Sequence, residues 1–167
     1  MPILRLVKRL LATVAVLAVA LPASSVAAAP NGSDDGTLSV KNATGRVLIR
    51  ATGGFIGRFD RGSIRIIDPV ADDGTGPIVS GAERSHDLND TTSVYTGTNV
   101  KFRLIGGRFR ILIIGSGIDL AVVGRGAVVL DGRGGSDGRY SFNGADYSSL
   151  PDTATTFDLM TGFPTGP

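Results

Sequence analysis

The chain has 167 residues, no cysteine and one histidine, and its 17 lysines and arginines nearly balance 15 aspartates and glutamates. Without cysteine, disulfides and thiolate metal sites are excluded, so stability must come from packing. Three basic residues belong to a predicted export signal, and the rest of the chain carries 14 basic and 15 acidic residues, a net charge of −1. That balance lacks the positive charge that drives nucleic-acid binding, which excludes a nucleic-acid partner.

The N-terminus has the pattern of a cleavable signal peptide. Arg5, Lys8 and Arg9 precede the apolar run Leu10–Leu21, and the small residues Ser25–Ala29 follow it. The run is shorter than the roughly 20 residues that a membrane-spanning helix needs. We therefore predict that residues 1–28 are removed and that the protein is secreted or extracytoplasmic, in a periplasm or cell wall, with no integral membrane segment after cleavage. Residues 29–36 are polar and predict a flexible leader.

Residues 37–147 consist of short apolar blocks separated by glycines at a regular spacing. Each block has the length of a β-strand, and each break is a turn that glycine makes without steric cost. Such spacing predicts an all-β domain, a small antiparallel sandwich or barrel of about eight to ten short strands, with a short β-solenoid as the alternative. The main breaks fall at Gly45, Gly53-Gly54, Gly62, Gly106-Gly107, Gly115-Ser116-Gly117 and Gly124-Arg125-Gly126.

The two halves of this domain resemble each other. Residues Gly45–Asp68 and Gly107–Asp131 both read as Gly-Arg, apolar strand, glycine-rich break, apolar strand, Arg-Gly, apolar strand and Asp. The pattern favours an internal duplication of a three-strand unit. The alternative is that any β protein punctuated by glycines matches itself at this level.

The connection between the halves and the C-terminal part contain weaker signals. Ile78–Gly81 and Val94–Thr96 are candidates for short edge strands, and Tyr140–Phe142 for one further strand. Residues 148–167 contain three prolines and predict a loosely ordered tail. Four apolar side chains are available to dock this tail on the domain: Phe157, Leu159, Met160 and Phe163.

One run in the second half does not alternate between apolar and polar residues. Ile111–Ile114 is apolar at every position. A strand that is apolar on both faces is typical of a site buried on both sides. We therefore predict that this strand is central.

Arginines alternate with apolar residues in several predicted strands. Successive side chains of a strand point to opposite faces, so Arg65, Arg103 and Arg110 each lie on the face opposite their apolar neighbours. If these strands are adjacent, the three arginines form a basic strip, with Arg108 and Lys101 near its edges. Guanidinium groups bind anionic polymers or lipid headgroups through bidentate contacts. The alternative is that the arginines only solubilise the face and pair with aspartates.

Aspartates gather in three predicted loops. Calcium takes oxygen ligands from such loops, but no twelve-residue calcium loop with a closing glutamate is present, and Glu83 is the only glutamate. Aspartate is also a common turn residue, so we predict solvated turns and no metal site. The three loops contain Asp68, Asp72 and Asp73, then Asp87 and Asp90, and finally Asp131 and Asp137.

Catalytic residues are scarce. His86 is the only histidine, and the neighbouring Ser85 and Asp87 do not make a triad, which is assembled from distant segments. Tryptophan, a common sugar platform, is absent. We therefore predict that the protein is not an enzyme and has no catalytic residues or cofactor, and a hydrolase using loop aspartates around His86 is the least favoured alternative.

The sequence leads to two main hypotheses of function. The first is an exported, non-catalytic binding or structural module of the cell envelope or extracellular space. It would contact an anionic polymer or lipid headgroups through Arg65, Arg103, Arg108 and Arg110. The second is a small-ligand carrier whose apolar interior is lined by Phe55, Phe59, Phe102 and Phe109.

Overall fold

The computed structural model describes residues 34–70, 74 and 76–166. The predicted signal peptide, residues 29–33 of the leader, Asp72 and Asp73 lie outside them. Among the described residues no helix is long and apolar enough to cross a membrane. These residues form seven strands and no helix: β1 (Gly36–Ile67), β2 (Ile78–Ser80), β3 (Arg84–Asn89), β4 (Thr92–Asp131), β5 (Arg139–Phe142), β6 (Ser148–Ser149) and β7 (Thr155–Asp158). The predicted all-β fold is confirmed.

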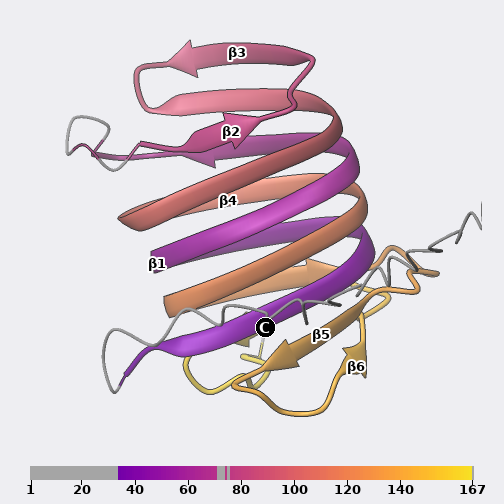
Figure 1. Ribbon diagram of the computed structural model, residues 1–167. Helices are drawn as coiled ribbons and strands as arrows, with labels where there is room; N and C mark the ends of the chain where they lie inside the picture. The colour runs from indigo at the N-terminus through magenta and orange to yellow at the C-terminus, as the bar shows by residue number, and fades with distance from the viewer. Residues whose placement is uncertain (1–33, 71–73, 75, 167) are drawn as a thin grey trace, which may run out of the picture.

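The two long antiparallel strands β1 and β4 form a two-stranded ribbon that coils helically around a central axis (Figure 1). β1 has 32 residues and β4 has 40. Each edge of β1 pairs with a different part of β4: Arg46, for example, is the partner of both Ile114 and Asp131, which lie 17 residues apart (131 minus 114). One turn of the ribbon therefore takes about 17 residues of β4, and the sheet stays open instead of closing into a barrel.

The coil has a front wall and a back wall, named as they lie in Figure 1. The front wall contains β5, β2 and the stretches 38–41, 56–58, 101–103 and 119–122 of the ribbon. The back wall contains β7, β3 and the stretches 46–50, 63–67, 92–96, 110–114 and 127–130. All neighbouring strands are antiparallel, so the coil resembles a solenoid only in its winding.

The predicted glycine turns are wrong, because β1 and β4 continue through them as bent strands. Gly53 and Gly124 show why glycine is needed at one of these corners. The two are paired, and their φ angles are 152° and 155°. A Cβ on either would overlap the carbonyl oxygen of the neighbouring strand, at Val123 or Thr52. The ribbon thus passes from wall to wall without losing its pairing, which is why there are fewer strands than predicted.

Apolar side chains fill the inside of the coil. The phenylalanines at 55, 59 and 109 are fully buried, and the rings of Phe55 and Phe109 meet edge to face with centroids 5.8 Å apart. The run Ile111–Ile114 lies in the middle of the back wall, as predicted, but it is not buried on both faces. Ile111 and Ile113 point into the core, Leu112 is half-buried on the outer face, and Ile114 is 38% exposed.

The C-terminal segment belongs to the same sheet. β7 pairs with β4, and Phe157 and Leu159 are buried, whereas Phe163 is 72% exposed. This segment pairs along the last edge of the back wall. It therefore does not form the loosely ordered tail that its prolines predict. β2 and β5 match the strands predicted at 78–81 and 140–142, whereas 94–96 lies within β4 and β3 was not predicted.

Candidate anion-binding surface

The structure divides the predicted arginine strip between the two walls. Arg65, Arg108 and Arg110 are exposed on the outer face of the back wall. Arg103 is exposed on the front wall, together with Lys101. The ribbon turns a corner at Gly106-Gly107, between residues 103 and 108, so the alternation that relates these arginines is interrupted there.

One arginine that sequence reasoning missed completes the group on the back wall. Arg50 is the direct cross-strand partner of Arg110, and Arg65 lies diagonally from Arg110 on the stretch that pairs with the other edge of residues 110–114. Side chains directly opposite each other on an antiparallel pair have Cβ atoms about 4.5–5.5 Å apart. Arg50 alternates with Ile49 and Ala51 just as the predicted arginines alternate with their neighbours, so this signal was present in the sequence. We call Arg50, Arg65, Arg108 and Arg110 the arginine surface.

The charges of the arginine surface are not neutralised within the described part of the chain. The ion pairs of the described residues are formed by three other arginines. They join Arg46 to Asp131 at 3.6 Å, Arg58 to Asp60 and Asp119 at 3.4 and 2.7 Å, and Arg125 to Asp35 at 3.3 Å. None of them involves the four arginines. Like charges placed opposite each other on a sheet are destabilising, so the arrangement has a cost that no described carboxylate offsets. Pairing with aspartates, the alternative to a binding role, fits Arg46, Arg58 and Arg125 but not these four.

Apolar side chains lie beside the arginine surface on the same outer face. Val129, Leu48, Leu112 and Arg65 are successive cross-strand partners, and the three apolar residues are half-buried. The aliphatic stems of arginines cover such positions while their guanidinium groups stay in water. The face can therefore present fixed cations above an apolar base.

The basic side chains of the front wall differ in how they are engaged. The Lys41 ammonium lies 4.4 Å from the centroid of the Tyr147 ring. Burial raises the pKa of Tyr147, but its hydrogen bond with Ser39 and the nearby Lys41 outweigh burial, so the pKa lies below its usual value. Within the described chain, Lys101 and Arg103 form no ion pair or hydrogen bond through their side chains, whereas Arg58 pairs with Asp60 and Asp119.

The residues considered for catalysis and metal binding take structural positions. His86 is exposed on β3, and the neighbouring Asp87 accepts a hydrogen bond from the Ser93 hydroxyl at 2.6 Å. Asp131 pairs with Arg46 and accepts a hydrogen bond from the Arg133 amide at 3.1 Å. The described residues hold no cluster of three or more side chains suited to a metal ion.

The phenylalanines expected to line a carrier's interior are packed in the core. The most exposed of the four, Phe102, is 3% exposed. The two hollows described for this chain both lie on its outer surface. No family model, curated protein or solved structure matches the chain at a significant level.

Proposed function

We propose that the protein is an exported, non-catalytic module that binds an anionic polymer of the cell envelope or extracellular space through the arginine surface. The pairing of Arg50 with Arg110, with no described carboxylate in an ion pair with either, is the observation that carries this proposal. Export rests on the signal-peptide pattern of residues 1–28.

A polymer suits this surface better than a single small anion. Arg108 and Arg110 are two residues apart on one strand, which separates them by about 7 Å, and Arg50 lies on the next strand. A chain with repeated phosphate or carboxylate groups can engage several of these guanidinium groups at once, so that each further contact is intramolecular. It would also offset the repulsion between Arg50 and Arg110.

The test is to measure binding of the purified chain to immobilised polyphosphate over a range of salt concentrations. We expect affinity to fall as salt rises, because exposed charges are screened over a Debye length of about 8 Å at physiological ionic strength. Hydrogen bonds to charged groups contribute about 1.5–3 kcal/mol each, so R50Q/R110Q should weaken binding at low salt by about ten-fold or more.

The matched control is K101Q/R103Q, which also removes two positive charges, from exposed side chains of the opposite wall that have no ion-pair partner among the described residues. It should leave polyphosphate affinity within about two-fold of the unchanged chain, since distant exposed charges are largely screened. Equal losses in K101Q/R103Q and R50Q/R110Q would mean that only net charge matters, and the proposed surface would be rejected. Binding to anionic vesicles but not to polyphosphate would replace the polymer with lipid headgroups as the partner.

A further inference from the structure

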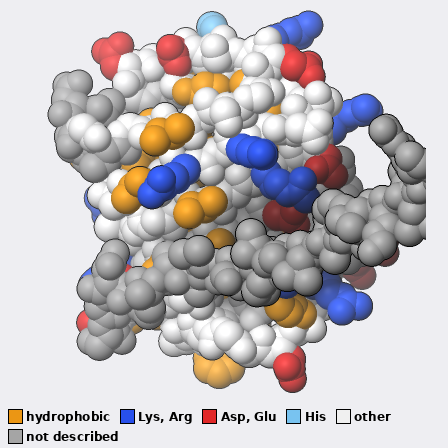
Figure 2. All heavy atoms as spheres, viewed as in Figure 1, with side chains coloured by type: hydrophobic (Ala, Val, Ile, Leu, Met, Phe, Trp, Pro, Cys, Tyr) orange, Lys and Arg blue, Asp and Glu red, His pale blue; other side chains and the backbone are white. Residues whose placement is uncertain are grey.

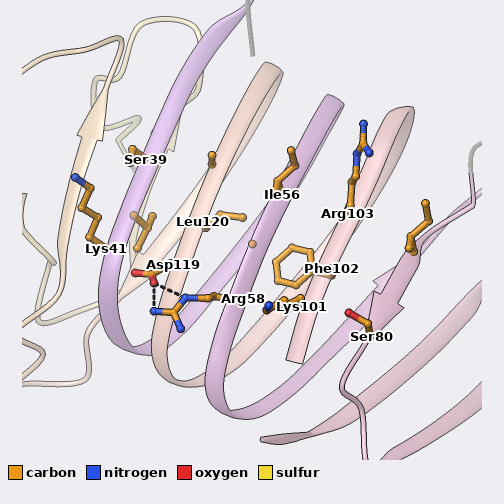
Figure 3. Close-up of a pocket in the computed structure, with 14 residues that line it drawn as sticks. Ser39, Lys41, Ile56, Arg58, Ser80, Lys101, Phe102, Arg103, Asp119 and Leu120 are labelled. Atoms are coloured by element: carbon orange, nitrogen blue, oxygen red, sulfur yellow. Dashed lines mark hydrogen bonds and ion pairs between the residues drawn. The ribbon is translucent and has the colours of Figure 1, made fainter. Parts of the chain in front are cut away.

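A groove crosses the outer face of the front wall, on the opposite side of the coil from the arginine surface (Figure 3). It is an open hollow of about 670 Å³. Its floor is the backbone of four neighbouring stretches of the ribbon, at Val40, Leu120, Gly57 and Phe102, which are successive cross-strand partners. The volume lies within the range of about 300–1,000 Å³ that is usual for small-molecule sites.

The two sides of the groove differ in chemistry. Residues on either side of the floor point outward, so each side is a row of cross-strand partners. One row is largely apolar, and its Ile56 and Ile78 are 52% and 61% exposed. It consists of Ser39, Ala121, Ile56, Arg103 and Ile78, and the facing row is Asp119, Arg58, Lys101 and Ser80, with Lys41 lining the groove at the Asp119 end.

Only one end of the groove has cations that are free to bind a ligand. Arg58 donates to Asp119 through Nε at 2.8 Å and also pairs with Asp60, and Lys41 lies over Tyr147. Lys101 and Arg103 have no such partner among the described residues. They are two residues apart on β4 and flank Phe102, which places their Cα atoms about 7 Å apart on the two sides of the groove floor.

Apolar side chains adjoin these two cations. Arg103 lies between Ile56 and Ile78 in its row, and Ala121 and Ser39 continue the row beyond Ile56. Figure 2 shows hydrophobic and basic side chains interleaved on this face of the molecule. From Arg103 to Ser39 the row crosses three strand spacings, about 14 Å. A track with apolar side chains at Ile56 and Ala121, ending at Ser39, therefore leads away from a pair of positive charges that have no ion-pair partner among the described residues.

We propose that this groove binds a single-chain anionic amphiphile. Lys101 and Arg103 hold its anionic head, and its alkyl chain lies along Ile56 and Ala121 towards Ser39. Such a ligand covers Ile56 and Ala121 and neutralises both free cations. A neutral amphiphile leaves the cations unpaired, and a small anion leaves Ile56 exposed. The site does not depend on the arginine surface, because the two lie on opposite walls.

Calorimetric titration of the purified chain with dodecyl phosphate, below its micelle concentration, tests the site directly. We expect binding at one site per chain. Two other probes separate the parts of the ligand: dodecyl maltoside has the same tail without charge, and inorganic phosphate is the head alone. Each should bind at least ten-fold more weakly. Equal affinity for the maltoside, equal affinity for phosphate, or no binding of dodecyl phosphate would overturn the proposal.

Two variants test the two ends of the groove. K101Q/R103Q should weaken dodecyl phosphate binding at least ten-fold by removing the head contacts. A121F should do the same by filling the track of the tail, with its circular dichroism spectrum unchanged because residue 121 is exposed. R50Q/R110Q is the matched control and should bind normally, which separates this site from the arginine surface. Normal binding by both groove variants would also overturn the proposal.

Discussion

Gly53 and Gly124 face each other where the ribbon turns from one wall to the other, and both positions are closed to a side chain. Gly53→Ala combines a backbone conformation that costs about 1–3 kcal/mol with an overlap that costs about as much again. We therefore expect its free energy of unfolding, measured in urea, to fall by about 2–6 kcal/mol.

The control for this substitution is Gly106→Ala. Gly106 also has a positive φ, 66°, but a Cβ added there would have no atom of another residue within 4 Å, its two chain neighbours aside. Alanine there should cost only about 1–2 kcal/mol, the ordinary penalty of the left-handed conformation. Equal losses at the two positions would show that close approach of the strands does not constrain Gly53.

Individual residues show how far sequence reasoning reaches. Alternation placed Arg65, Arg108 and Arg110 correctly on the outside, because the strand period fixes the face locally. Alternation also placed Arg103 on the outside, but it could not show that the corner at Gly106-Gly107 puts Arg103 on the other wall. A glycine at a corner and a glycine in a turn are the same residue type, and only the approach of a neighbouring strand distinguishes them. Nothing in the local sequence records that neighbour.

At the scale of elements, β7 attaches the C-terminal segment to the coil. Phe157 is buried, and its ring centroid lies 5.2 Å from those of Tyr140 and Phe142. Truncating a buried phenylalanine costs about 3–5 kcal/mol, so Phe157→Ala should lower the free energy of unfolding by about that amount. Phe163→Ala is the matched control, and its exposed side chain predicts a change within about 0.5 kcal/mol. If chemical denaturation gives the same small change for both, the segment is detached, as its prolines suggested.

The strands also show which part of the fold the sequence could not supply. The sequence predicted strand-length apolar blocks where the structure has strands, and it predicted β2 and β5. What was missed is that the blocks join into two strands coiled around each other. That arrangement depends on Arg46 meeting both Ile114 and Asp131, contacts across 68 and 85 residues (114 minus 46, 131 minus 46). Periodicity over a window of a few residues contains no information about such pairs.

At the scale of the whole molecule, the coil predicts unequal protection of its backbone. Ile49 and Ile111 lie in stretches paired on both edges, inside the back wall. Among the strands that the structure describes, β3 pairs only with β4, and all six of its residues are exposed. Amides in central strands exchange only through global unfolding, whereas edge segments open locally.

We therefore expect hydrogen exchange, followed by nuclear magnetic resonance, to report the full free energy of unfolding at Ile49 and Ile111 and much less in β3. An uncovered strand edge is also where another chain can add by main-chain hydrogen bonding. If the β3 amides exchange as slowly as Ile111, the edge is covered in solution. Repeating the measurement at lower protein concentration then shows whether another copy of the chain or residues of the same chain cover the β3 edge, since only association between copies weakens on dilution.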